Sequence, residues 1–229
     1  MEAALKRNIN TFSAAIFDMD GTLVDSMSMW SDIDREYLGK YGIPMPPDLQ
    51  KAIDPLTWEE CELYFRDVLG IRKTTEEIGR EWLDMAMQKY EHEVALKPGV
   101  REILAYLKES GTSIGVASSS SRAMIEGALS AHDILRYFDA IVPCDEAGAG
   151  KPDPACYLAA AKKLGKKPAD CVVFEDLPNG IRAGLNAGMT VIAVDDMYSR
   201  PMEDEKRKLA DGLIRDFREL LPQNLHKNG

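Results

Sequence analysis

The spacing of hydrophobic positions divides the chain into three parts. A short apolar run at residues 14–17 ends at a carboxylate, as in a buried parallel strand. From residue 27 to about residue 95 the apolar positions recur only at helical spacing. Beyond that point, short apolar runs alternate with helical stretches of about ten residues, which is typical of a doubly wound parallel sheet. The pattern therefore predicts an α/β core formed by residues 1–26 and 96–229, interrupted by a helical insert at residues 27–95.

The helices of the insert have recognisable ends. The first is followed by Gly42 and a proline-rich stretch, which end a helix. The other two begin with a threonine, Thr57 or Thr74, followed three residues later by a glutamate, which is the pattern of a capping box. The expected helices cover residues 27–41, 57–70 and 74–90.

In the second part of the core, the apolar runs predict strands at residues 113–117, 139–142, 171–175 and 190–194. Helical stretches lie before and between them, at residues 100–110, up to Leu129, at 154–164 and at 179–188. A final helix, strand and helix close the chain.

The charge of the chain restricts the kind of partner it can have. The chain has 229 residues, of which 45% are hydrophobic and 29% charged, and its net charge is −10. A broad nucleic-acid-binding surface is excluded, because phosphate backbones require clustered lysine and arginine. A small phosphorylated metabolite remains compatible, since one lysine and one metal ion can neutralise it locally. The pattern does not indicate the oligomeric state, and a monomer is the default expectation.

The cysteines and histidines argue against a disulfide frame and against a site built on soft ligands. The four cysteines form no C-x-x-C pair, and the three histidines are scattered. Reduced thiols in a cytoplasmic protein are expected. The first residues lack the apolar region of a signal peptide, and no apolar run approaches membrane-spanning length, so no membrane association is expected.

Polar side chains follow four of the predicted strands, at the point where each strand ends. They are Asp18 and Asp20, the serines at 118–121, Lys151, and the pair Glu175-Asp176. Because the carboxyl ends of parallel strands meet at one edge of a sheet, we expect these groups to share one crevice. Carboxylates in one cleft repel each other unless a cation lies among them, and oxygen-only ligands favour Mg²⁺. The lysine and the serine hydroxyls suit a phosphoryl group.

These segments resemble the four motifs of the haloacid dehalogenase superfamily, in the correct order. They are DMDGT at residues 18–22, Ser118 after GVA, Lys151 in KPDP, and Glu175-Asp176. The match covers the whole core, which implies a Rossmann-like fold. The insert resembles the C1-type helical cap of the β-phosphoglucomutase and phosphoglycolate phosphatase branch.

The resemblance implies roles for the two aspartates of the first motif. Asp18 corresponds to the nucleophile that forms an aspartyl-phosphate, and Asp20 to the general acid that protonates the leaving oxygen and then activates water. Haloacid dehalogenases themselves lack the second aspartate. Its presence here favours phosphoryl transfer, and we expect a phosphatase that hydrolyses a small phosphorylated metabolite.

The resemblance also implies two sets of binding residues. Mg²⁺ would be held by Asp18, by the backbone carbonyl of Asp20 and by Asp176, with Glu175 in support. The phosphoryl oxygens would be bound by Ser118 and Lys151, with help from Ser119 and from the backbone of Asp20 to Thr22. Ser121 is expected to be a helix N-cap instead.

Two other functions fit part of the pattern. Sugar phosphomutases of the β-phosphoglucomutase type couple a cap-helix histidine and a cap-loop arginine to their general acid. The corresponding segments here, MSMWSDIDREYLGKYG and AIDPLTWEE, have no histidine and no arginine respectively. Thr22 also matches the phosphatases of the family. A phosphatase is therefore the preferred expectation, and a mutase is the alternative. Receiver domains that accept phosphate on aspartate are a more distant one, since they lack the acid-x-acid pair and the insert.

The identity of the substrate is left open by the sequence. Sugar phosphates, nucleoside monophosphates and phosphoglycolate all remain possible substrates. The methionines and tryptophans of the insert are interpreted mainly as packing residues, although those near its junction with the core are also placed to face a substrate.

Overall fold

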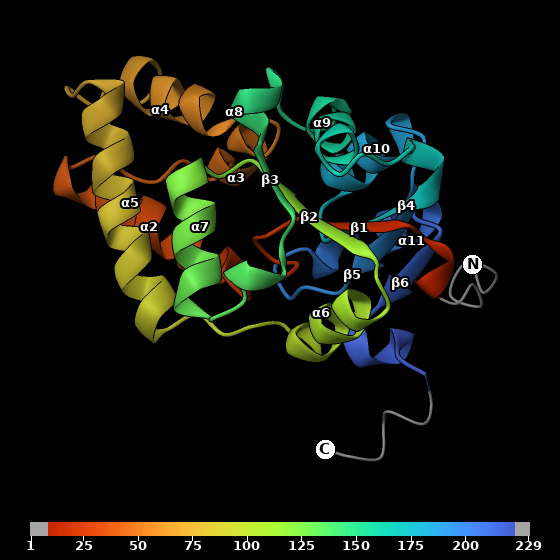
Figure 1. Ribbon diagram of the computed structural model, residues 1–229. Coiled ribbons are helices and arrows are strands. Elements are labelled where there is room, and N and C mark those ends of the chain that lie inside the picture. The colour runs from red at the N-terminus through yellow and green to blue at the C-terminus, as the bar shows by residue number, and fades with distance from the viewer. Residues whose placement is uncertain (1–8, 223–229) are drawn as a thin grey trace.

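The computed structural model describes residues 9–222, so the first eight residues of the predicted core and its last seven lie outside the described residues. Six parallel strands form one sheet in the order β3-β2-β1-β4-β5-β6. The strands are β1 Ala14–Phe17, β2 Ser113–Ser118, β3 Ala140–Pro143, β4 Cys171–Glu175, β5 Thr190–Val194 and β6 Gly212–Ile214. Helices cover both faces of this sheet (Figure 1), which confirms the predicted doubly wound α/β fold.

The strands bury alternate side chains against two helical layers. Ala15 and Phe17 of β1 belong to the core cluster that includes helices α6 and α7, whereas Ala14 and Ile16 belong to the cluster with α9 and α10. Because both faces are covered, the strands are apolar between their ends instead of alternating. The helices of the core are α6 Val100–Glu109, α7 Arg122–Ala131, α8 Cys144–Ala147, α9 Ala155–Lys163, α10 Pro178–Asn186 and α11 Glu203–Leu209. The 3₁₀ helices are Ile9–Thr11, Leu135–Tyr137, Pro168–Asp170, Arg200–Met202 and Phe217–Leu220.

The insert consists of four helices and contains none of the strands of the sheet. They are α2 Met27–Lys40, α3 Leu49–Ile53, α4 Trp58–Asp67 and α5 Thr75–His92. The capping boxes predicted at Thr57 and Thr74 are both present, each with the reciprocal glutamate bond. Helix α3 was not predicted, because five residues are too few to show a period. The division into a core domain and a cap domain at residues 26/27 and 95/96 stays a prediction.

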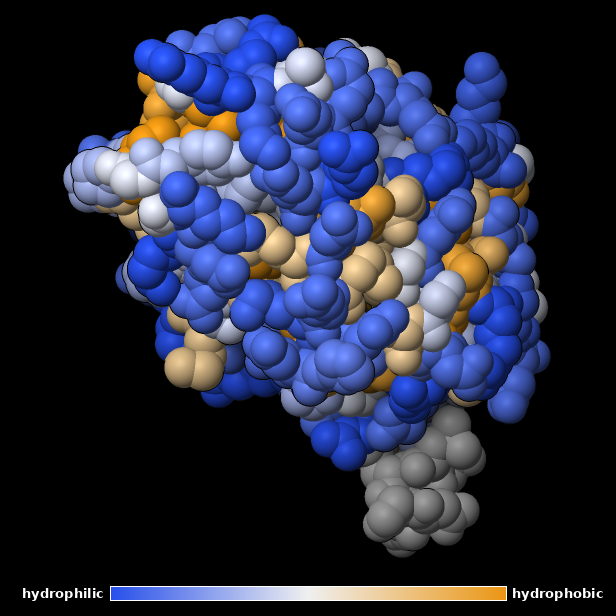
Figure 2. Space-filling model, turned by 90° about the vertical axis from the view of Figure 1, so that its left-hand side faces the viewer, coloured by the Kyte–Doolittle hydropathy of each residue, from blue (hydrophilic) through white to orange (hydrophobic). Residues whose placement is uncertain are grey.

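The insert packs against the core through α5 and α7, which lie side by side in Figure 1. Gly127 of α7 allows this approach, because a Cβ there would lie 2.4 Å from Sδ of Met87 on α5. The outer face of the insert is mainly hydrophilic, with hydrophobic residues showing only in small areas between polar ones (Figure 2). The apolar sides of the insert helices are therefore turned inward.

Two further expectations concern the chain as a whole. All four cysteines are free, as predicted, and three of them are buried. Across residues 9–222, none of the helices combines the length and the apolar character that crossing a membrane requires.

Candidate active site

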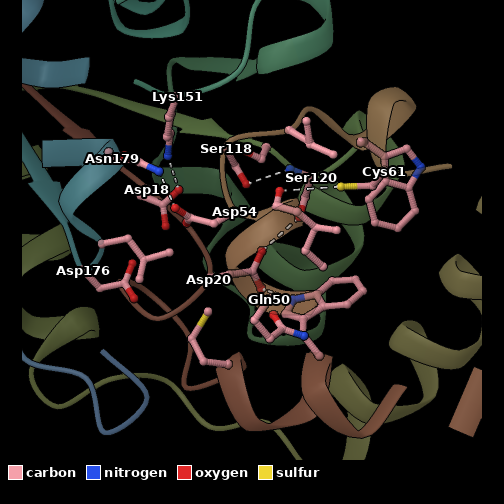
Figure 3. A pocket seen from close by; sticks show the side chains of 18 of the residues that line it. Asp18, Asp20, Gln50, Asp54, Cys61, Ser118, Ser120, Lys151, Asp176 and Asn179 are labelled. Carbon is pink, nitrogen blue, oxygen red and sulfur yellow. Dashed lines mark hydrogen bonds and ion pairs between the residues drawn. The ribbon is translucent and has the colours of Figure 1, made fainter. Parts of the chain in front are cut away.

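The residues of the first motif lie where the strand order reverses. Strand β1 lies between β2 and β4. The chain adds β2 and β3 on one side of β1, then crosses over and adds β4, β5 and β6 on the other. Ligands of open α/β sheets bind in the crevice that this reversal opens at the carboxyl ends of the strands. Asp18 and Asp20 follow β1 directly and line a cavity of about 180 Å³ between the sheet edge and the insert. Figure 3 shows this cavity.

A buried lysine connects the ends of β1 and β4. Nζ of Lys151 lies 2.5 Å from Oδ1 of Asp18 and 2.6 Å from Oε1 of Glu175. Tyr157 of α9 donates a hydrogen bond to the same oxygen of Glu175. The other oxygen of Glu175 accepts the backbone N–H of Asp176 at 3.1 Å. Glu175 is thus held by protein groups at both oxygens, which suits the supporting role predicted for it.

The charges of this cluster do not balance. Burial raises the pKa of Asp18 well above its usual range, against the lowering effect of Lys151. Burial also raises the pKa of Asp176, and the carboxylates of Asp18 and Glu175 add to this rise. Burial lowers the pKa of Lys151, but its two carboxylate partners more than offset this and raise it overall. With all four groups ionised, three carboxylates against one ammonium leave two negative charges.

The donor set fits a divalent cation. Carboxylate oxygens of Asp18, Glu175 and Asp176 lie within 4.8 Å of one another. Oδ2 of Asp176 is buried and has no hydrogen-bond partner among the described residues, although buried polar atoms are normally paired. An oxygen-only set of this kind suits Mg²⁺, whose two charges would balance the cluster.

Gly21 leaves room for the carboxylate of Asp176. Its φ is +76°, and a Cβ there would lie 2.3 Å from Oδ2 of Asp176. Gly21→Ala should therefore displace the carboxylate and weaken the apparent affinity for Mg²⁺ about 10- to 100-fold. Magnesium titration of both activity and thermal stability would measure the effect.

Gly111→Ala is the matched control, because Gly111 has nearly the same φ of +75° and no described atom within 4 Å of its Cβ position. It carries the backbone strain without the clash. Equal magnesium affinities for the two variants would contradict the role given to Asp176.

The serines after β2 have different surroundings. Ser118, which is buried, lines the cavity and accepts the backbone N–H of Ser120 at 3.1 Å. Ser119 also lines the cavity, and its hydroxyl lies 3.9 Å from Sγ of Cys144. Ser121 accepts the backbone N–H of Met124 at the start of α7, so its predicted capping role is confirmed. Thr22 is buried, its hydroxyl has no partner among the described residues, and it is not part of the cavity wall, so its phosphate-binding role stays a prediction.

Asp20 is held by four donors that the sequence pattern did not indicate. Its Oδ1 accepts hydrogen bonds from Ser26 at 2.5 Å, from Trp30 Nε1 at 2.9 Å and from Tyr90 at 2.5 Å. Its Oδ2 accepts the hydroxyl of Ser120 at 2.9 Å. Trp30 and Tyr90 come from α2 and α5, so this carboxylate is tied to the insert as well as to the core.

Comparison with known proteins decides the family. The family model for haloacid dehalogenase-like hydrolases matches residues 15–194. The chain belongs to this family. The match begins inside β1 and ends with β5, so it includes all four motifs on which the predicted resemblance rests.

Curated relatives of this hydrolase are phosphatases by name. Hexitol phosphatase B from Escherichia coli (strain K12) is 32% identical over 218 residues, covering 93% of this chain and 96% of that protein. The bifunctional riboflavin kinase/FMN phosphatase of Arabidopsis thaliana is 36% identical over 186 residues, which is 81% of this chain. The chain spans about half the length of that second relative, since the match covers 49% of it.

Solved structures of similar fold agree with the family. CbbY from Rhodobacter sphaeroides, in complex with phosphate, superposes with a TM-score of 0.80 at 26% identity, covering 91% of this chain and 96% of that one. A putative β-phosphoglucomutase from Thermotoga maritima gives a TM-score of 0.67 at 28% identity, covering 94% of this chain and 98% of that one. Both likenesses extend over the insert.

In this hydrolase the tryptophans of the insert both pack together and face the cavity. The ring centroids of Trp30 and Trp58 are 5.9 Å apart, and those of Trp58 and Trp82 are 5.3 Å apart. All three also line the cavity, together with Met27. The interpretation as packing residues was therefore correct for their mutual contacts. Met27 and Trp30 lie near the junction with the core, where contact with a substrate was expected, whereas the contact of Trp82 with the cavity was not predicted.

Two polar pairs in the cavity wall were also missed. Gln50 donates to Oδ2 of Asp34 at 2.6 Å, and Asn179 donates to Oδ2 of Asp54. A signal for Asp34 exists in the sequence, because it lies four residues after Trp30 on the buried face of α2. A carboxylate on an apolar helix face is costly without a partner, and that cost points to a function.

Proposed function

We propose that this hydrolase is a Mg²⁺-dependent phosphatase of small phosphorylated metabolites that acts through an aspartyl-phosphate on Asp18. The observation that carries the proposal is the meeting of Asp18, Asp20, Ser118, Lys151 and Asp176 from four strand ends at one cavity. Relatives named as phosphatases of hexitols and of phosphorylated carbohydrates support it. We also propose that the protein acts in the cytoplasm.

In the first half of the reaction, a carboxylate oxygen of Asp18 attacks phosphorus in line with the leaving oxygen. The bond from phosphorus to that oxygen breaks, and Asp20 supplies the proton that the leaving alcohol takes up. Lys151 and the hydroxyls of Ser118 and Ser119 stabilise the charge on the phosphoryl oxygens. The product of this step is the free alcohol and a phosphorylated Asp18.

In the second half, Asp20 takes a proton from water, which attacks phosphorus and releases inorganic phosphate. Asp18 regains its carboxylate, and Asp20 is protonated again for the next substrate. Asp18, Asp176 and the backbone carbonyl of Asp20 would hold Mg²⁺, with Glu175 in support. When bound, the ion supplies positive charge that lets the dianionic phosphate approach these carboxylates.

A sugar phosphomutase is the second candidate, and the fold similarity to a putative β-phosphoglucomutase favours it. A mutase must bind a bisphosphate, whose second phosphate requires its own cation. Among the described residues that line the cavity, Lys151 is the sole lysine or arginine, and it is paired with Asp18 and Glu175. This lining supports the phosphatase.

The test is phosphate release from a panel of phosphorylated metabolites, measured with Mg²⁺ and with EDTA. We expect release from at least one small monophosphate, its loss on adding EDTA, and its return with excess Mg²⁺. The panel includes β-glucose 1-phosphate with a trace of the 1,6-bisphosphate. Full activity in metal-free buffer, or stronger rescue by Zn²⁺, would contradict the metal assignment. Glucose 6-phosphate that accumulates faster than free phosphate would establish the mutase instead.

A further inference from the structure

The part of the cavity that faces the insert has a chemistry of its own. Two carboxylate–amide pairs lie in its wall, Asp34 with Gln50 and Asp54 with Asn179. The second pair shares the cavity wall with Glu175 and Lys151, and Asn179 comes from α10, which closely follows Glu175 in the chain. The first pair belongs entirely to the insert, where Asp34 comes from α2 and Gln50 from α3. The wall therefore continues from the phosphate site into the insert.

Such pairs suit hydroxyl groups. In each pair an amide donates to one carboxylate oxygen, while other carboxylate oxygens and the amide oxygen remain as acceptors. A hydroxyl both donates and accepts, so it can join such a pair without leaving a buried polar atom unpaired. Trp82, which also lines the cavity, has a buried ring N–H that finds no acceptor among the described residues. The apolar faces of the tryptophans suit the C–H groups of a carbon chain or ring.

The same wall disfavours a second anion. Asp34 is buried, with 5% of its surface exposed, and burial raises its pKa to about 6, so it is ionised at neutral pH. A carboxylate or phosphate on the leaving group would face Asp34 and Asp54 with no free cation in the described lining. Like charges that come into contact in a partly buried site repel each other strongly.

The size of the cavity limits the leaving group further. About 180 Å³ is available, which is below the roughly 300–1,000 Å³ of pockets for drug-sized ligands. A compact leaving group therefore suits this space better than a large one.

We propose that the substrate is the monophosphate of a small uncharged polyol, selected by Asp34 with Gln50 and Asp54 with Asn179. This inference rests on the proposed phosphatase function and deepens it. In this proposal, the specificity is determined by two residue pairs that lie outside the four motifs. They act by accepting hydroxyls and by repelling any leaving group that carries a second negative charge.

The test compares kcat/KM of the full chain in Mg²⁺ for five substrates. They are sorbitol 6-phosphate, 2-phosphoglycolate, fructose 1,6-bisphosphate, phosphoethanolamine and acetyl phosphate. We expect sorbitol 6-phosphate to exceed each of the next three by about tenfold or more, the effect of one hydrogen bond to a charged group. Acetyl phosphate reports whether the phosphoryl-transfer groups work at all.

The outcomes distinguish a failure of the proposed phosphatase function from a failure of the proposed polyol specificity. No hydrolysis of any of the five would overturn the proposed function, and the inference with it. Hydrolysis of acetyl phosphate together with equal or faster turnover of the carboxylate or bisphosphate substrate would overturn the inference alone. Faster turnover of phosphoethanolamine than of sorbitol 6-phosphate would also overturn it, because the wall would then recognise a cation.

Two variants assign the selectivity to the wall. Asp34→Asn keeps the shape and removes the charge, so the preference for sorbitol 6-phosphate over fructose 1,6-bisphosphate should fall about tenfold, mainly through KM. Gln50→Lys places a cation beside the cavity at a half-buried position and should shift the preference in the same direction. Asp32→Asn, an exposed change on the same helix, is the matched control. An unchanged preference in both folded wall variants would refute the assignment.

Discussion

Asp18→Asn is expected to abolish turnover while the protein stays folded. The substitution puts a neutral amide in place of the oxygen that attacks phosphorus, and loss of a nucleophile lowers kcat by a factor on the order of 10⁴ or more. The fold should tolerate the change, because burial already raises the pKa of Asp18 and the isosteric amide removes a poorly solvated charge. Phosphate release and a thermal melt measure the two effects.

Asp25→Asn provides the control, since Asp25 precedes α2 with an exposed side chain and is not part of the cavity wall. It should keep turnover near that of the unchanged chain. Measurable hydrolysis by pure Asp18→Asn protein, above the level of contaminating phosphatases, would refute the covalent mechanism.

Asp20→Asn is expected to have the second-largest effect, and its size should depend on the leaving group. The variant cannot protonate the departing oxygen, and general acid catalysis contributes about 10²–10⁴-fold. An alkyl phosphate needs that proton, so its kcat should fall by about this factor. p-Nitrophenolate leaves without it, so p-nitrophenyl phosphate should lose much less in the phosphorylation step. Single-turnover rates for the two esters measure the difference.

The Asp20→Asn substitution also alters the hydrogen bonds around residue 20. The comparison of the two esters distinguishes this positional effect from the loss of the acid. The amide oxygen of the Asp20→Asn variant can still accept from Ser26 and Trp30, but the charge that these donors face is lost. A purely positional defect would slow both esters alike. An equal loss for the alkyl and the nitrophenyl ester would therefore show that Asp20 is not the acid.

The parts of the fold that could be predicted from sequence are those with short-range signals. The capping boxes at Thr57 and Thr74 and the apolar strand at 14–17 are complete within a few residues. The site at the strand ends was predictable for a related reason, because parallel strands carry the polar groups that follow them to a common edge.

The residues that the sequence did not indicate depend on distant contacts. Asn179 meets Asp54 across 125 positions, and Tyr90 meets Asp20 across 70. Neither pair produces a pattern along the chain, since each partner is unremarkable in its own helix or loop. Asp34 is the exception, because a carboxylate on a buried helix face is visible from spacing alone.

The position of Lys151 shows how fold and chemistry combine. The residue is 6% exposed, and its ammonium lies between two carboxylates that come from different strands. In the sequence it is one of many loop lysines, and only the KPDP context singles it out. The parallel sheet then brings it to Asp18, where we propose that its charge stabilises the phosphoryl oxygens.

If the phosphoryl group passes through Asp18, the protein carries it there covalently for part of each turnover. Mixing a hydrolysable polyol phosphate with excess protein in Mg²⁺, quenching in acid after successive short times, and analysing the peptides by mass spectrometry tests it directly. We expect a phosphoryl group on the peptide containing Asp18 that appears before free phosphate and then decays. Free phosphate that appears with no protein-bound phosphoryl group at any time, or with one on another residue, would contradict it.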